Sequence, residues 1–126
     1  MKATRETRQA AGAAHSKLVA DIRLDLGLVP DLVLWQNVQA AGDVWVPETG
    51  ATRHIRAGLA KGCSDLIGCL DGRFLALEAK TGTGRLTSDQ EQFGAVVRAK
   101  GGFACVVRSV DEARAAIARA RAGANQ

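Results

Sequence analysis

Asp71 and Gly72 constrain the fold of this chain more than any other residues, because they separate two apolar runs, residues 66–70 and 74–79. An Asp-Gly pair between apolar runs is the strongest short-range signal for a β-hairpin with a two-residue turn. The turn also sets the register of the strands, since a shift by one residue would move every side chain to the opposite face. We therefore predict an antiparallel hairpin with Asp71 and Gly72 at its tip.

The register of this hairpin brings two carboxylates together. Leu70 opposes Arg73 directly across the turn. Counting away from the turn, Asp65 lies opposite Glu78, and opposed residues share one face with Cβ atoms about 4.5–5.5 Å apart. Lys80 lies two residues beyond Glu78, so its side chain points to the same face. The hairpin is thus expected to present two acids and one lysine side by side.

Two facing carboxylates among apolar neighbours repel each other, and a divalent cation between them would convert the repulsion into attraction. Mg²⁺ and similar hard ions prefer carboxylate oxygens and retain water molecules for chemistry. A lysine beside them could stabilise developing negative charge or orient a water molecule. The arrangement is compatible with a site for phosphodiester hydrolysis. The alternative is a surface hairpin with solvated charges, in which Glu78 and Lys80 form a weak exposed pair.

The composition is that of a single domain. The chain has 126 residues, 47% of them hydrophobic, which is enough for one compact core. A net charge of +4 favours a polyanionic partner. No apolar run reaches the roughly 18 residues of a membrane span, and residues 1–16 do not have the apolar segment of a secretory signal. The number of cysteines is three, and an odd number favours reduced thiols in the cytoplasm. No two cysteines have C-x₂-C spacing, so the sequence does not support a zinc site. No motif for a small-molecule cofactor is present.

The chain in order predicts alternating helices and strands. The expected elements are a helix over 15–26, a strand over 31–38, a long connection over 40–62, the hairpin, a helix from Thr87 to Lys100, a strand over 103–108 and a last helix from Ser109. Strands separated by helices, with apolar residues on both faces, define an α/β fold with a mixed β-sheet flanked by helices. We interpret residues 1–13 as a loose N-terminal arm and residues 14–126 as a single domain.

The chain also resembles a known nuclease family. Asp65 followed, after an apolar strand, by Glu78-Ala79-Lys80 is similar to the core motif of the PD-(D/E)XK nucleases. Three surrounding segments narrow the resemblance to the VRR-NUC branch, in the small stand-alone form found in phages and bacteria. They are KGCSDLIG (61–68), LTSDQEQF (86–93) and KGGFACVVRS (100–109). The match covers about residues 35–112 and is specific in order and spacing.

This resemblance implies a restriction-endonuclease-like PD-(D/E)XK core and a metal-dependent DNA endonuclease that uses Mg²⁺ or Mn²⁺ in a bacterial cell or a phage-infected host. Asp65 and Glu78 would bind the metal, with the backbone carbonyl of Ala79 as a further ligand. Lys80 would position or activate the attacking water. The resemblance also implies a homodimer, and since a two-fold dimer can address two strands, branched DNA such as a four-way junction is the expected substrate. The alternative is a nucleic-acid-binding module that keeps the fold without cleaving.

Gln90 has two compatible roles. Thr87 and Gln90 have the spacing of a capping box, which is a structural role at the start of a helix. In the resembling family, a glutamine in an S/T-x-x-Q-x-x-F context belongs to the active site, and here Phe93 completes that context. We favour the active-site role for Gln90, with capping beside it.

The resembling family usually has a glutamate on its first helix that contributes to the metal site. His15 lies near that position in this chain, whereas Glu6 and Asp21 are less well placed. The default interpretation of His15 is a surface histidine, and the alternative is a metal ligand.

Four basic residues are the candidate contacts to DNA phosphates. Arg53, Arg56 and Lys61 belong to the long connection over residues 40–62, and Arg85 belongs to the loop after the Glu78 strand. A connection of this length in a small domain is usually functional or mobile. Arginine and lysine are the usual partners of phosphate oxygens. The alternative is that the connection is merely solvated.

Overall fold

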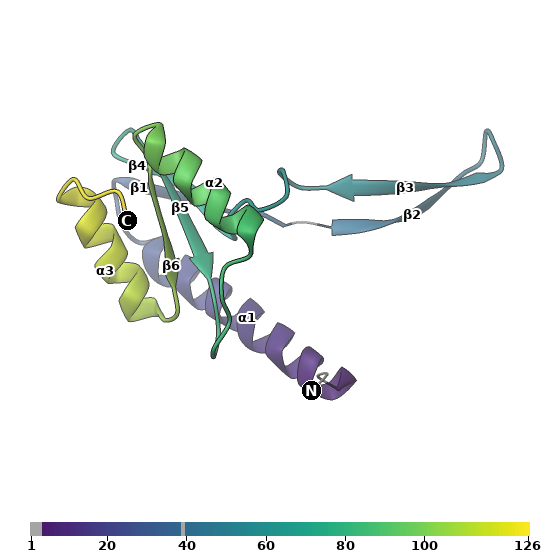
Figure 1. Cartoon of the computed structure of the whole chain (residues 1–126), viewed down its shortest axis with the longest axis horizontal. Coiled ribbons are helices and arrows are strands. Elements are labelled where there is room, and N and C mark those ends of the chain that lie inside the picture. Colours follow the sequence, from purple (N-terminus) through teal and green to yellow (C-terminus); the bar gives the residue numbers. More distant parts are fainter. Residues whose placement is uncertain (1–3, 39) are drawn as a thin grey trace.

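A computed structural model describes residues 4–38 and 40–126 of the chain (Figure 1). Its helices and strands are α1 (Arg5–Leu26), β1 (Leu32–Gln36), β2 (Ala40–Val46), β3 (Ala51–Ala57), β4 (Leu66–Leu70), β5 (Arg73–Ala79), α2 (Ser88–Ala99), β6 (Phe103–Val107) and α3 (Val110–Arg121). Four strands form one sheet in the order β1-β4-β5-β6, and β2 and β3 form a separate two-stranded sheet. In the larger sheet, β4 is antiparallel to both β1 and β5, and β6 is parallel to β5.

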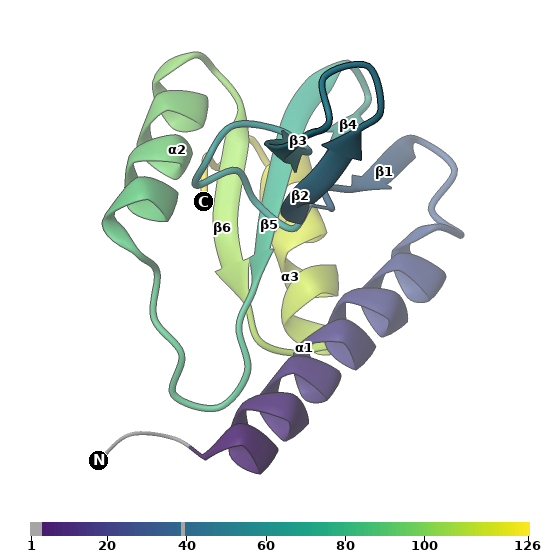
Figure 2. The ribbon, with the colours of Figure 1, turned by 90° about the vertical axis from the view of Figure 1, so that its right-hand side faces the viewer.

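The helices cover both faces of the four-stranded sheet. α2 lies on one face, while α1 and α3 lie on the other (Figure 2). α2 connects β5 to β6, as two parallel strands require a crossover. The prediction of an α/β fold with a mixed sheet flanked by helices is confirmed. None of the helices in the described part of the chain combines the length and apolar character needed to cross a membrane.

The hairpin of β4 and β5 has the predicted turn and register. Leu70 pairs with Arg73, and the antiparallel pairing continues back to the start of β4. Asp71 and Gly72 both have positive φ angles, 47° and 84°. A type I′ turn requires positive φ at both central residues, and Asp-Gly tolerates this at little steric cost. The local chemistry of two residues therefore determines which side chains of the two strands face each other.

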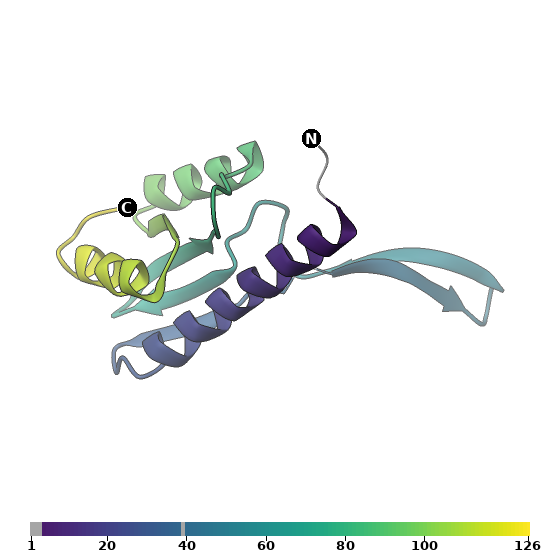
Figure 3. The same ribbon diagram turned by 90° about the horizontal axis from the view of Figure 1, so that it is seen from below.

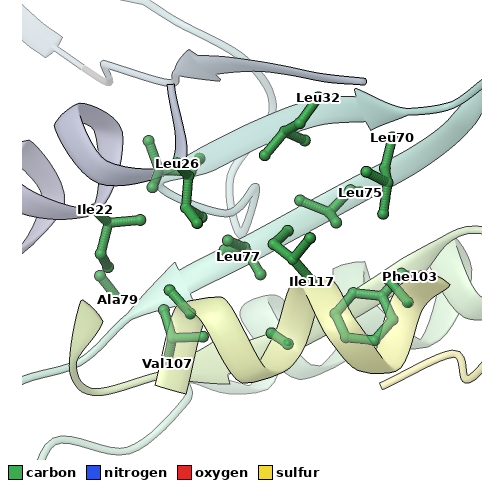
Figure 4. Close-up of a cluster of buried hydrophobic side chains, with 14 of the residues drawn as sticks. Ile22, Leu26, Leu32, Leu70, Leu75, Leu77, Ala79, Phe103, Val107 and Ile117 are labelled. Atoms are coloured by element: carbon green, nitrogen blue, oxygen red, sulfur yellow. The ribbon is translucent and has the colours of Figure 1, made fainter. Parts of the chain in front are cut away.

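The main core lies between the sheet and the pair of helices α1 and α3 (Figure 4). Leu75 and Leu77 of β5 both point into this core, because alternate residues of a strand share one face. Both side chains are fully buried. Ile22 of α1 and Phe103 of β6 are also fully buried. Burial of each such side chain contributes roughly 1.5–3 kcal/mol. A smaller cluster holds α2 against the opposite face, and it consists of Ala76, Val97 and Ala104 with Ile67 and Phe93 packed against it.

α1 begins at Arg5, well before the predicted start near residue 15. Residues 5–13 are helical, although they were predicted to belong to a loose N-terminal arm. Residues 1–3 of that N-terminal arm lie outside the described residues. The side chain of Thr4 caps the helix by accepting a hydrogen bond from the backbone N–H of Thr7 at 3.2 Å. Alanine-rich sequence favours helix by itself. Because this part of α1 is exposed, no apolar stripe marks it in the sequence.

Residues 40–57 form a projecting β-hairpin, not the irregular connection that the sequence predicted (Figures 1 and 3). We call this hairpin the arm, as distinct from the N-terminal arm that was predicted over residues 1–13. Gly50 in its tip has a φ of 65°. The described residues of the arm are almost all exposed, and even Trp45 is 62% exposed. The prediction was wrong because neither face of the arm is buried within the chain, so its strands do not have the clear alternation of half-buried strands.

Two ion pairs attach α3 to the elements that precede the sheet. Arg114 donates from Nε to Asp25 Oδ2 of α1 at 2.8 Å, and Arg121 binds Asp31, just before β1. The hydrogen bond from each arginine holds the pKa of its aspartate below the ordinary value. The pair to Asp25 helps to fix the position of α1 across the sheet.

Candidate active site

The two predicted acids meet where β4 begins and β5 ends, at the part of the sheet that α1 crosses (Figure 1). The backbone N–H of Asp65 donates to Glu78 Oε2 at 3.1 Å. The backbone N–H of Ala79 donates to Asp65 Oδ2 at 2.8 Å. The backbone of each strand therefore orients the carboxylate of the other strand.

Glu78 is a buried acid with a strongly altered affinity for protons. Burial, together with the negative charge of Asp65, raises its pKa from 4.5 to about 7. Lys80 acts in the opposite direction, with its Nζ 3.5 Å from Glu78 Oε1. The side chains of Lys80 and Glu78 are only 17% and 7% exposed. This burial contradicts the alternative interpretation of a solvated surface pair.

Gln90 reaches the acids from the first turn of α2. Its Nε2 donates to Glu78 Oε1 at 3.0 Å. Its Oε1 accepts from the backbone N–H of Thr87 at 2.9 Å, and the Thr87 hydroxyl accepts from the backbone N–H of Gln90 at 3.2 Å. The predicted capping box is confirmed, and the same side chain also contacts Glu78.

His15 lies at the site although its default interpretation was a surface histidine. Its Nε2 is 3.2 Å from Asp65 Oδ2, and its side chain is 39% exposed. The longer α1 places His15 in the middle of the helix, opposite the end of β5. The sequence signal was only its rough alignment with the family glutamate, since an isolated histidine on a helix carries little information about its partner.

Asn37 is a supporting residue to which sequence reasoning assigned no role. Its backbone N–H donates to the carbonyl oxygen of Asp65 at 2.7 Å. Its side-chain Oδ1 accepts from the backbone N–H of Leu59, beyond the arm, at 3.3 Å. Asn37 therefore connects the backbone of Asp65 to the base of the arm. Its position directly after β1 is the one sequence feature that could have indicated this.

The four predicted DNA contacts are exposed, and none of them is bonded to Asp65, Glu78 or Lys80 in the described part of the chain. Arg53 and Arg56 belong to β3 in the arm, and their spacing of three places them on opposite faces. Lys61 follows the arm, and its Nζ lies 3.3 Å from Asp89 Oδ2 at the start of α2. Arg85 lies in the loop between β5 and α2.

Two local features surround these basic residues. A hollow of about 290 Å³ at the base of the arm is lined in part by Arg56 and Lys61. The loop that contains Arg85 is held by the guanidinium of Arg108, which donates to the carbonyl oxygens of Gly82 at 3.3 Å and Gly84 at 2.7 Å. Contact of these residues with DNA stays a prediction.

The chemistry of the donor set fits a hard divalent cation. Asp65 and Glu78 supply two carboxylates. Burial first, and then the negative charge of Asp65, raise the pKa of Glu78, and the positive charge of Lys80 offsets this only in part. A cation would supply the missing positive charge. Within the described ranges, no three His, Cys, Asp or Glu side chains form a preassembled metal-binding group. The Ala79 carbonyl as a ligand stays a prediction.

Neither a protein-family model nor a curated protein matches this chain. The nuclease interpretation therefore rests on the residues of the chain and on their arrangement.

Proposed function

We propose that this protein is a metal-dependent DNA endonuclease with a PD-(D/E)XK core similar to the stand-alone VRR-NUC branch. The observation that carries the proposal is the convergence of two acids, a lysine and a glutamine at the end of β5. These residues are Asp65, Glu78, Lys80 and Gln90. Strongly altered pKa values in charged clusters are typical of functional sites. A purely structural hairpin has no use for two facing acids, one of them buried.

Each of these residues has a distinct role in the proposed reaction. Asp65 and Glu78 would hold Mg²⁺ or Mn²⁺, whose charge offsets the negative charge that develops on the phosphate. Lys80 would orient the attacking water and donate to a phosphate oxygen. Gln90 would keep the Glu78 carboxylate in one orientation through its 3.0 Å hydrogen bond.

The proposed substrate is branched DNA, such as a four-way junction, and the proposed active form is a homodimer. An isolated two-stranded hairpin is only marginally stable in water. One face of the arm carries Val44 and Ile55, which are 45% and 43% exposed. A second copy of the chain that covers this face would stabilise the arm. Two-fold symmetry would then present two active sites to two DNA strands.

The alternative is a DNA-binding module that keeps this fold without cleaving. The observation that favours it is that the described residues contain no preassembled group of three metal-binding side chains. Such a module would bind DNA tightly, and its behaviour would not depend on divalent cations.

The test is cleavage of labelled four-way junction, flap and linear duplex DNA in the presence of Mg²⁺ or Mn²⁺. Wild type is compared with Lys80→Ala and Glu78→Ala. The matched controls are Lys100→Ala and Glu48→Ala, which remove the same charges from exposed positions outside the site.

We expect metal-dependent cleavage that falls at least about a hundredfold in both site variants, since this is the usual cost of removing one group that stabilises the transition state. Both controls should cleave like wild type. Tight DNA binding without cleavage in either metal would support the binding module instead.

A further inference from the structure

α1 brings a metal-binding side chain to the acids, and that side chain is an imidazole. His15 Nε2 lies 3.2 Å from Asp65 Oδ2. His15 is held by the backbone of a long helix, and its side chain is 39% exposed. Asp65 is connected to Glu78 through its own backbone N–H. An ion bound to both carboxylates would therefore lie close to this imidazole.

The acidic side chains of α1 do not take this position. Asp21 pairs with Lys17 of the same helix, with 2.6 Å between Oδ2 and Nζ. Asp25 binds Arg114 of α3. Glu6 lies in the first turn of α1, roughly 13 Å along the helix axis from the histidine at 1.5 Å per residue. An oxygen ligand from α1 is thus absent from the described contacts of Asp65.

The spacing between the imidazole and the carboxylate is compatible with binding one ion. Two neighbouring ligands on an octahedral ion with bonds of about 2.1 Å lie about 3.0 Å apart. The observed 3.2 Å between His15 Nε2 and Asp65 Oδ2 is close to this spacing. It also suits a direct hydrogen bond, so the two interpretations must be separated by experiment.

An imidazole ligand changes which ion a site prefers. Mg²⁺ favours a shell made of oxygen atoms, including several water molecules. Mn²⁺ also takes oxygen ligands, but as a first-row transition ion it accepts an imidazole nitrogen more readily than Mg²⁺ does. A site with two carboxylates and one imidazole should therefore discriminate against Mg²⁺.

We propose that His15 is a direct metal ligand and that it makes the site prefer Mn²⁺ to Mg²⁺. This inference rests on the proposed metal-dependent function and adds to it a third protein ligand and an ion preference.

The test uses Mn²⁺ as the probe with the full chain. Pulsed electron paramagnetic resonance of bound Mn²⁺ detects the nitrogen of a coordinated imidazole, and calorimetry gives the affinities for Mn²⁺ and Mg²⁺. Wild type is compared with His15→Ala, His15→Glu and His54→Ala. The chain has two histidines, and His54 is the matched control because it lies on the arm, where its Nδ1 is 2.9 Å from Asp43 Oδ1.

We expect a nitrogen signal in wild type and in His54→Ala, and no nitrogen signal in His15→Ala. The ratio of Mn²⁺ to Mg²⁺ affinity should fall at least about tenfold in His15→Glu. Even the loss of a residue that only supports a metal ligand lowers metal affinity about tenfold or more. Retained Mg²⁺ binding by His15→Glu will show that this variant is folded.

Two other outcomes have different meanings. Mn²⁺ that binds wild type without a nitrogen signal, but is lost in Glu78→Ala, would overturn the role of His15 and leave the proposed function standing. Failure of wild type to bind either ion would overturn both this inference and the metal-dependent function.

Discussion

Gln90 serves the acid site and helix α2 at the same time: its Nε2 donates to Glu78 Oε1 at 3.0 Å, and its Oε1 accepts from the backbone N–H of Thr87 at 2.9 Å. One amide thus uses its acceptor for the helix and its donor for the buried acid. Because the two ends of an amide differ chemically, the cap determines which end faces Glu78. The orientation of this carboxylate is therefore coupled to the first turn of α2.

Variants at Thr87 and Gln90 should separate capping from the active-site role. Thr87→Ala removes the side-chain cap and keeps the backbone N–H that orients Gln90, so we expect a loss of about 1 kcal/mol in stability and near-normal cleavage. Gln90→Ala should cost similar stability and lower cleavage at least about tenfold, as for other residues that orient metal ligands. Urea unfolding and junction cleavage measure the two effects. Equal cleavage rates in both variants would show that Gln90 acts only as a cap.

The raised pKa of Glu78 predicts how stability depends on pH without metal. Between pH 4.5 and 7 the folded protein retains a proton on Glu78 that the unfolded chain has lost. The free energy of unfolding should therefore fall as pH rises through this window, on the order of 1 kcal/mol per pH unit, and level off above it. Asp25 and Asp31 have lowered pKa values, so their contributions to the free energy of unfolding are lost only as pH falls below 3.8, outside this window.

Glu78→Gln removes this titration and should flatten the dependence of stability on pH between 4.5 and 7. Urea unfolding at several pH values, with chelator present, measures both curves. Parallel curves for wild type and Glu78→Gln would show that another group is responsible. Addition of Mn²⁺ should stabilise wild type most at high pH, where Glu78 is ionised and the ion does not have to displace a proton.

Gly62 is required where the connection after the arm meets the start of α2. Its φ is 89°, and a Cβ there would lie 2.4 Å from the backbone oxygen of Asp89. Gly50 at the tip of the arm also has a positive φ, but a Cβ there meets no atom within 4 Å. We expect Gly50→Ala to cost about 1–2 kcal/mol, from left-handed strain alone, and Gly62→Ala to cost at least about twice as much. Urea unfolding compares them, and equal losses would contradict the close approach at Gly62.

The arm should mediate self-association through one face. Ile55→Asp places a charge on the face that also carries Val44, whereas Thr52→Asp places the same charge on the opposite face. If a second copy covers the Val44 face, Ile55→Asp should shift the protein to monomers in sedimentation velocity, and Thr52→Asp should not. The same oligomeric state for both variants and wild type would argue against this interface.

The parts of the fold that the sequence predicted correctly depend on local chemistry. The turn at Asp71 and Gly72 determines the register of β4 and β5, and the Thr87 box determines the start of α2. Both signals act over a few residues, so no distant contact can hide them. The arm and the first half of α1 were missed because they are exposed, and burial is what produces a readable apolar pattern.

The sequence by itself determined that Asp65 would face Glu78 with Lys80 beside them, since strand alternation and one turn leave no other arrangement. Only the tertiary structure decided that His15 and Asn37 meet Asp65. Their contacts depend on how α1 crosses the sheet and on how β1 pairs with β4, and these placements are set by core packing and by ion pairs between distant segments. Such packing is the sum of many weak contacts, and no short pattern in the sequence encodes it.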